Sequence, residues 1–159
     1  MSGVARTLKE AARLTSATRS LILRSSEDLV CMNLMCPKVG GACLCRLAVT
    51  VSRLQGLREL DIANNDLGVL PESVFELPVL EQLDISGNRL KALPPGIGAL
   101  SSLRTLRMSN NLVETLPSEL GQLGLLEELH VGGNSGLVQE DLSELLRRRP
   151  TLKIFADEG

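Results

Sequence analysis

Three consecutive copies of one 23-residue pattern fill the centre of this chain and constrain its fold more than any other feature. The copies start at Leu57, Leu80 and Leu103 and run without a gap to Leu125. Each follows the frame LxxLxLxxNxLxxLPxx(L/I/V)xxLxx, with apolar residues at fixed slots and Asn at the ninth. One such unit cannot bury its own apolar side chains, so neighbouring units must stack and share a core.

The first half of each unit has the pattern of a strand followed by a turn. In the second copy Leu80, Leu83 and Ile85 alternate with polar residues, which indicates a short strand with one buried face. Asn88 follows where the chain leaves that strand, and its amide can pair with backbone groups that burial would otherwise leave unsatisfied. We therefore expect a structural ladder of asparagines in this slot: Asn65, Asn88, Asn111 and Asn134.

The second half of each unit returns on the opposite side of the core. Pro71, Pro94 and Pro117 begin these returns, and each fixes φ at about −65° and lacks an N–H. They favour an extended or 3₁₀ segment over a regular helix. The sequence therefore predicts an α/β fold: a right-handed solenoid with a curved parallel sheet on its concave face and irregular, 3₁₀ or helical segments on its convex face.

Composition suits one folded domain. The chain has 159 residues, of which 43% are apolar and 23% charged, and a net charge of −2. This charge implies no bulk attraction to nucleic acid or to a membrane surface. No apolar run reaches the roughly 18 residues of a membrane span, and the N-terminus lacks a compact secretory signal. We expect neither nucleic acid nor a membrane as a partner.

The segments before Leu57 are less regular. Residues 1–17 carry apolar residues at helical spacing, which predicts a capping helix over the end of the core. Their basic, Ser/Thr-rich character leaves a mitochondrial targeting segment as the alternative. Residues 18–56 fit the frame as a first repeat if residues 31–45 are an insertion. A competing frame starts a degenerate repeat at Leu34, with strand residues Pro37 and Val39.

The insertion contains all four cysteines, Cys31, Cys36, Cys43 and Cys45, in the spacing C-x4-C-x6-C-x-C. Zinc sites usually bring paired C-x2-4-C knuckles, and one-residue spacing strains tetrahedral ligation. Disulfides are not expected without a secretion signal. We interpret the segment as a loop of reduced thiols, and a metal- or redox-responsive element is the alternative. We expect no cofactor and no resident metal.

The C-terminal part departs from the frame in an interpretable way. Residues 57–148 hold four repeats of 22–24 residues, and the last one loses its proline and gains leucines at helical spacing. Three arginines suit the negative end of this expected helix, and Pro150 ends it. We interpret them as a solvated helix end and not as a nucleic-acid patch. Residues 149–159 then supply a terminal strand and a short polar tail.

The side chains that alternate with the strand leucines face the concave side and form the candidate binding site. One column is expected to run across adjacent strands about 5 Å apart, through Asp61, Asp84, Arg107, His130 and Lys153. A negative strip at Glu59, Asp61 and Asp84, followed by positive residues at Arg104 and Arg107, fits a protein partner by charge complementarity. The candidate protein-binding residues are Glu59, Asp61, Asn64, Gln82, Asp84, Arg107, Glu128 and His130.

Nothing in the sequence indicates catalysis. His130 is the only histidine, and the pattern places it on an open strand face without an identifiable nucleophile beside it. No glycine-rich phosphate loop is present, because Gly132 and Gly133 are strand-end positions of the repeat. We expect no catalytic residues.

The LPxxI/L form of the repeat, clearest over residues 57–134, resembles the intracellular leucine-rich repeat proteins such as Ras suppressor protein, the scribble and erbin group and the plant intracellular Ras-group proteins. The resemblance implies a leucine-rich repeat solenoid that acts as a cytoplasmic adaptor. It would be a monomer that holds an unidentified protein on its concave face, in signalling of the small-GTPase type. The chain is shorter than these relatives, with about five repeats. An organellar assembly or scaffold factor remains the alternative function, beside the cysteine-based element.

Overall fold

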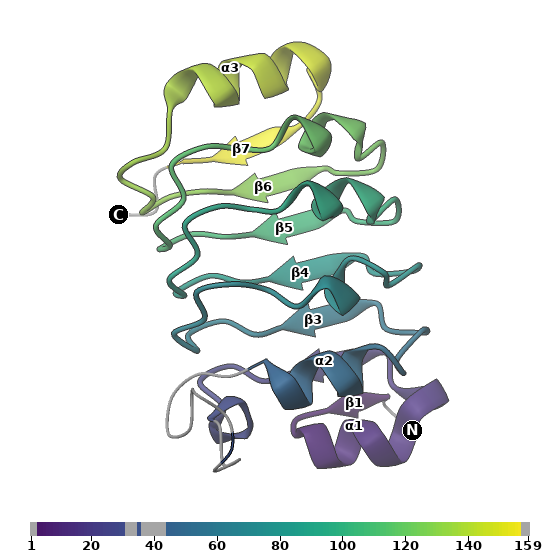
Figure 1. Cartoon of the computed structure of the whole chain (residues 1–159). Coiled ribbons are helices and arrows are strands. Elements are labelled where there is room, and N and C mark those ends of the chain that lie inside the picture. Colours follow the sequence, from purple (N-terminus) through teal and green to yellow (C-terminus); the bar gives the residue numbers. More distant parts are fainter. Residues whose placement is uncertain (1–2, 31–34, 36–43, 157–159) are drawn as a thin grey trace.

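All strands of the described chain join one open parallel sheet in sequence order (Figure 1). The computed structural model describes residues 3–30, 35 and 44–156. Every neighbouring pair of strands is parallel, as the repeat frame predicts. The strands within the described residues are Val4–Ala5 (β1), Ser20–Ile22 (β2), Glu59–Asp61 (β3), Gln82–Asp84 (β4), Thr105–Arg107 (β5), Glu128–His130 (β6) and Lys153–Phe155 (β7).

The segments between the strands form the convex layer. In the three central repeats Pro71, Pro94 and Pro117 have φ of −71°, −71° and −68° and directly precede a 3₁₀-helix, so the predicted 3₁₀ return is confirmed. The described 3₁₀-helices are Thr15–Ala17 (η1), Glu27–Leu29 (η2), Glu72–Val74 (η3), Pro95–Ala99 (η4) and Ser118–Gln122 (η5). The described α-helices are Leu8–Leu14 (α1), Cys45–Val51 (α2) and Gln139–Arg148 (α3).

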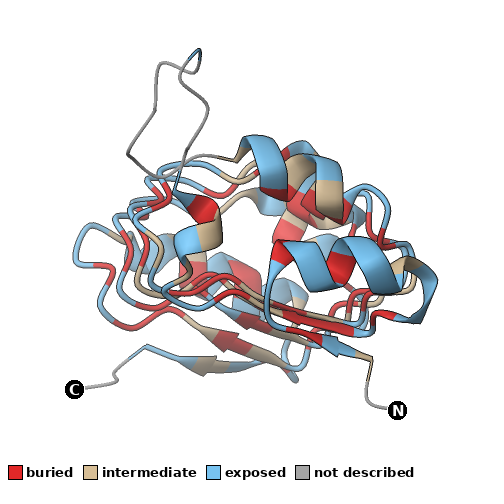
Figure 2. Cartoon of the chain, turned by 90° about the horizontal axis from the view of Figure 1, so that it is seen from below, coloured by how far each residue is buried: buried red, intermediate tan, exposed pale blue. Residues whose placement is uncertain are grey.

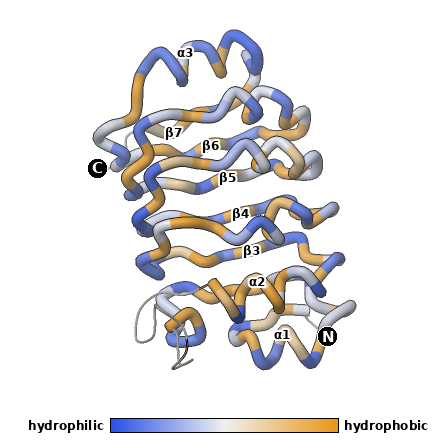
Figure 3. Tube along the Cα trace, viewed as in Figure 1, coloured by the Kyte–Doolittle hydropathy of each residue, from blue (hydrophilic) through white to orange (hydrophobic). Residues whose placement is uncertain are grey.

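One continuous apolar core lies between the sheet and the convex layer. In Figure 2 buried positions occur both in the strands and in the convex segments, and in Figure 3 apolar positions of successive coils line up along the stack. Leu80, Leu83 and Ile85 are at most 1% exposed. The core extends from Leu8 in α1 to Leu145 in α3. Each coil therefore covers the apolar face of its neighbour, as stacking of single repeats requires.

Buried asparagines join the coils by a repeated set of hydrogen bonds. The Asn88 side chain donates to the carbonyls of Ile85, in its own coil, and Ile62, in the preceding one, at 2.9 and 3.0 Å. Its Oδ1 accepts from the backbone N–H groups of Asn65 and Leu67, both at 3.0 Å. The other rungs of the ladder, Asn65, Asn111 and Asn134, also donate to carbonyls of their own and of the preceding coil, and each accepts from one backbone N–H of the preceding coil.

The N-terminal segment is a short coil of the solenoid and not a helix alone. Helix α1 is capped by Thr7, whose hydroxyl accepts from the N–H of Glu10 at 3.1 Å. Before it, β1 pairs with β2 and adds a strand that the sequence did not predict. Two residues are too few to show an alternating pattern, which explains why β1 was missed.

Within residues 18–56, β2 pairs directly with β3 along its whole length. Pro37 and Val39, the strand residues of the competing frame, lie outside the described residues. Most of the expected insertion 31–45, including Cys31, Cys36 and Cys43, lies outside the described residues. Its last residue, Cys45, is exposed and opens helix α2.

The expected C-terminal helix is α3, and the arginines at its end make contacts within the protein. The Arg149 guanidinium donates to the carbonyls of Leu123, Gly124 and Leu126, the latter two at 2.9 and 3.1 Å. Arg147 and Arg148 both pair with Glu144 in α3. Arg149 therefore ties the last coil to the turn before β6.

A left-handed turn follows the central strands, and its residues pack against one another. Gly87 has φ of +65° and Asn64, one coil earlier, has φ of +57°. A Cβ added at Gly87 would lie 1.9 Å from Oδ1 of Asn64. Gly87→Ala is therefore expected to lower the free energy of unfolding by about 1–3 kcal/mol, measured by urea unfolding.

Gly68→Ala is the matched control, because an added Cβ there meets no atom within 4 Å and its backbone is not left-handed. It should cause no loss beyond about 0.5 kcal/mol. Asn64→Gly in the Gly87→Ala background removes the contacting amide and should recover part of the loss. Equal losses at Gly68 and Gly87 would contradict this explanation.

Candidate functional site

Two rows of side chains project from the concave face of the sheet between the buried leucines. Strand register defines the first row as Glu59, Gln82, Thr105, Glu128 and Lys153. The second row is Ile22, Asp61, Asp84, Arg107, His130 and Phe155. Consecutive coils thus bring seven of the eight candidate residues onto one surface. The eighth, Asn64, lies past the end of β3 in the left-handed turn.

One expectation about these rows is wrong. Lys153 lies opposite Glu128 in the first row, and Phe155, not Lys153, continues the second row beside His130. The last coil has one residue fewer between its first buried leucine and its strand, and a shift of one residue moves every side chain to the next position. The row therefore ends in an aromatic ring instead of an ammonium group.

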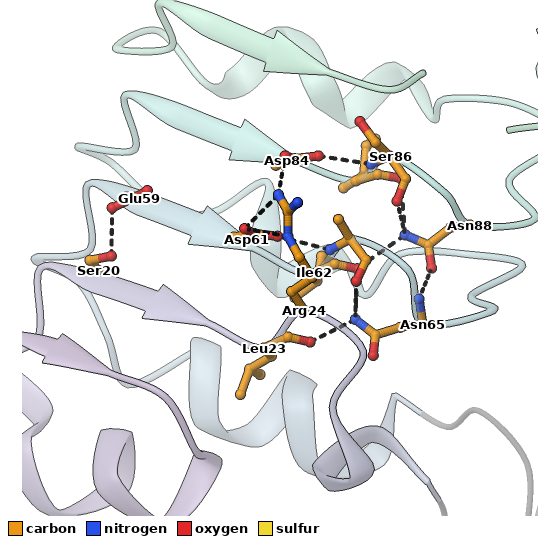
Figure 4. Close-up of polar contacts among 12 residues, drawn as sticks. Ser20, Leu23, Arg24, Glu59, Asp61, Ile62, Asn65, Asp84, Ser86 and Asn88 are labelled. Atoms are coloured by element: carbon orange, nitrogen blue, oxygen red, sulfur yellow. Dashed lines mark hydrogen bonds and ion pairs between the residues drawn. The ribbon is translucent and has the colours of Figure 1, made fainter. Parts of the chain in front are cut away.

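The two aspartates of the second row share one guanidinium (Figure 4). Nη2 of Arg24 lies 2.9 Å from Oδ2 of Asp61 and 2.9 Å from Oδ2 of Asp84. The side chains of these aspartates are only 15% and 14% exposed. The hydrogen bond with Asp61, together with its charge, raises the pKa of Arg24 above its ordinary value. Arg24 therefore offsets one of the two aspartate charges, and the expected negative strip keeps a net negative charge.

Sequence reasoning missed Arg24 as a site residue. The repeat frame aligns it with Ala63, a slot that the candidate residues do not include. The backbone hydrogen bond from the N–H of Ser25 to the carbonyl of Ala63 fixes this register. That slot faces the concave side and lies two residues after the slot of Asp61. Arg24 occupies it in the coil before that of Asp61. The alignment could have indicated the bridge.

Other charges near the concave face are also paired internally. The Ser20 hydroxyl donates to the Glu59 carboxylate at 2.5 Å. In the slot just before the strands, charges alternate in sign from coil to coil and form pairs at 3.0 and 2.5 Å. These edge pairs are Arg58 with Glu81 and Arg104 with Glu127. Arg104 therefore does not contribute a free positive charge to the later repeats, contrary to expectation.

The later strands carry a different surface. Arg107 on β5 is exposed and makes no ion pair with any described residue. Beside it, the His130 ring stacks on Phe155, with ring centroids 4.3 Å apart and an angle of 11° between the planes. The Glu128 carboxylate lies 3.7 Å from Nε2 of His130. This end of the face presents a cation and an aromatic stack.

Removing the bridging guanidinium tests how much the second row depends on it. Arg24→Leu leaves Asp61 and Asp84 on adjacent strands without their shared cation. We expect a loss of about 1–2 kcal/mol in the free energy of unfolding, because charged hydrogen bonds are lost and two carboxylates remain close. Urea unfolding at low salt measures the effect.

Arg89→Leu is the control, because Arg89 and its partner Asp66 are 70% and 74% exposed. It should change stability by less than about 0.5 kcal/mol. In Arg24→Leu, adding Asp84→Asn should restore part of the loss by removing one like charge. No difference between the Arg24 and Arg89 variants would show that the bridge contributes nothing.

The geometry of the face suits binding rather than chemistry. The hollow around Asp61, Asp84 and Arg107 has a volume of only about 50 Å³, which does not enclose a substrate. Among residues 3–30, 35 and 44–156, no group of three or more His, Cys, Asp or Glu side chains could hold a metal ion. None of the helices in this part of the chain is long and apolar enough to span a bilayer.

Stacked coils with a parallel sheet, an asparagine ladder and proline-led returns define the class of leucine-rich repeat solenoids. The sequence profile described as "Leucine-rich repeat region" matches residues 36–156. The chain belongs to the leucine-rich repeat family. This family and fold are those of protein-interaction modules.

Two solved structures agree with this assignment. A leucine-rich repeat protein of Leptospira interrogans is 35% identical over 67% of this chain, with a TM-score of 0.62. The internalin InlF of Listeria monocytogenes is 19% identical over 97% of the chain, with a TM-score of 0.64, and shows the fold alone. The chain spans 27% and 45% of the lengths of these two proteins. No curated protein sequence matches it at a significant level.

Proposed function

We propose that this chain is a non-enzymatic adaptor that binds another protein on the concave face of its sheet. The observation that carries the proposal is the alignment of polar and aromatic side chains from successive strands on one open surface, of which Gln82, Arg107, Lys153 and Phe155 are exposed. Its backbone is held by the asparagine ladder, so the side chains are positioned before a partner arrives. Such preorganisation limits the entropy lost on binding.

The charged residues available to a partner differ from those the sequence suggested. Charge reversal at Asp61 or Asp84 would break the bridge to Arg24 and change stability together with binding. Gln82 gives a cleaner test, because it is exposed in the first row of β4 and its side chain makes no hydrogen bond with the described residues. A large side chain there blocks the centre of the face without disturbing an ion pair.

The experiment compares Gln82→Trp with Ser101→Trp, which places the same ring at an exposed turn outside the sheet. Each variant is used as bait in quantitative affinity capture, and the captured protein is then purified and titrated by calorimetry. We expect Gln82→Trp to weaken its binding at least tenfold and Ser101→Trp to leave it within twofold. A partner whose affinity is equal for both variants would exclude the concave face.

We also propose a cytoplasmic location and a role in small-GTPase-type signalling. The support is the resemblance of the LPxxI/L repeats to intracellular relatives. Fluorescence of a chain tagged at its C-terminus should be diffuse in the cytoplasm. Import into mitochondria, with loss of the basic N-terminal segment, would favour the alternative of an organellar assembly factor.

A further inference from the structure

The two halves of the concave face differ in what they leave open to a partner. On β3 and β4, the carboxylates of Asp61 and Asp84 are mostly buried and already bound to Arg24. Glu59 accepts a hydrogen bond from Ser20. A ligand that used these groups would have to displace existing partners. The exposed charged and aromatic side chains of the two rows lie on β5 and β7, at Arg107, Lys153 and Phe155.

Arg107 is the centre of this second half. Its guanidinium has five N–H donors, and no described carboxylate pairs with it, because its row neighbour Asp84 is held by Arg24. Lys153 on β7 is likewise exposed and without an ion pair among the described residues. The one carboxylate on these strands, Glu128, lies 3.7 Å from Nε2 of His130. Among the described residues of β5, β6 and β7, the two cations Arg107 and Lys153 thus outnumber the one carboxylate.

An apolar platform lies in the same row. Phe155 is 39% exposed and stacks on His130, which in turn lies beside Arg107 on the adjacent strand. Arginine and aromatic side chains are enriched among the residues that dominate binding energy at protein interfaces. This chain has no Trp or Tyr and only two Phe. The exposed Phe155 ring lies in the same row as Arg107, with His130 between them. It is therefore the strongest anchor that the concave face offers.

We propose that the basic–aromatic patch, formed by Arg107, His130, Lys153 and Phe155, binds an acidic linear segment of the partner protein. A carboxylate of that segment pairs with the Arg107 guanidinium, and an aromatic or aliphatic side chain packs on Phe155. This inference rests on the proposed function of the concave face. Charge complementarity selects an acidic segment over a basic one, because a basic segment would meet Arg107 and Lys153.

The test selects peptides from a displayed library of random twelve-residue sequences on the immobilised full chain. The best sequences are then synthesised and titrated by fluorescence anisotropy. We expect enrichment of Asp and Glu around an aromatic or aliphatic residue, with affinity that falls as salt is raised. Arg107→Glu should weaken binding at least tenfold, and Phe155→Ala at least fivefold.

Arg104→Glu is the matched control, because Arg104 lies at the start of the same coil but outside the two rows, and should leave binding within twofold. Circular dichroism and urea unfolding verify that each variant is folded. Selection of basic or uncharged peptides, or acidic peptides that bind the Arg107→Glu variant equally well, overturns the inference. If the peptides that overturn the inference no longer bind the Gln82→Trp variant, the proposed function of the concave face stands without the acidic-segment inference. If those peptides bind the Gln82→Trp variant as well as the original chain, both the inference and the proposed function fail.

Discussion

Asn88→Ala is expected to lower the free energy of unfolding by about 3–5 kcal/mol. The side chain is 6% exposed and serves four backbone groups at 2.9–3.0 Å. Alanine leaves these N–H and C=O groups buried without partners, and each unsatisfied group costs about 1–3 kcal/mol before relaxation. Because three of them, at Ile62, Asn65 and Leu67, belong to the preceding coil, the loss should weaken the contact between two coils and not one coil alone.

Urea unfolding followed by circular dichroism measures this loss. Gln82→Ala removes a comparable amide from the exposed face and should change stability by less than about 0.5 kcal/mol. Hydrogen exchange should show the reduced protection first at the turns that contain Asn65 and Asn88. A loss below about 1 kcal/mol for Asn88→Ala would mean that water replaces the amide and that the ladder is not essential.

Arg149→Ala is expected to produce the second large effect, about 2–3 kcal/mol. The guanidinium donates to three carbonyls in the turn between η5 and β6, and hydrogen bonds from charged donors are stronger than neutral ones. Without it, α3 and β7 lose their link to the preceding coil. Hydrogen exchange should therefore detect opening of this terminal coil at lower denaturant than the rest of the sheet.

Arg147→Ala is the control, because that side chain is 79% exposed and its ion-pair partner among the described residues is Glu144 at 3.4 Å. It should change stability by less than about 0.5 kcal/mol. Arg149→Lys keeps the charge but cannot reproduce a planar fork with three acceptors, so an intermediate loss is expected. Full stability of Arg149→Lys would assign the effect to charge at the end of α3 and not to the fork.

The parts of the fold that could be predicted are those that every coil repeats. Pro71, Pro94 and Pro117 each begin a 3₁₀ return, because a fixed φ and a missing N–H act locally and do not depend on distant residues. The burial of the leucines could also be predicted, because the repeat frame fixes which slots face the core. The parallel order of the strands then results from stacking.

The candidate site was harder to predict because its contacts join different slots. Arg24 pairs with Asp61 on β3 and with Asp84 on β4. The bridge therefore joins three coils, and the pattern of a single repeat cannot show it. It engages both aspartates of the expected acidic strip and offsets one of their charges. The stack of His130 on Phe155 depends on a coil that is one residue shorter, and no rule of the repeat sets that length. Irregular coils are where sequence periodicity stops being informative.

Two features of the central coils alternate instead of repeating. The charged slot before each strand is occupied in turn by Arg58, Glu81, Arg104 and Glu127. Salt bridges join Arg58 to Glu81 and Arg104 to Glu127. The left-handed turn runs Asn64, Gly87, Asn110 and Gly133, and each glycine makes room for the asparagine amide of the coil before it.

This alternation determines how the protein can be shortened or lengthened. Excision of residues 80–102 would set Arg58 beside Arg104 and an asparagine against an asparagine, so like charges and a steric overlap would meet at the new junction. Excision of residues 80–125 would set Arg58 beside Glu127 and an asparagine beside a glycine, which restores both matches. The coils are therefore exchangeable in pairs, and a duplication or deletion of one coil alone creates a mismatched joint.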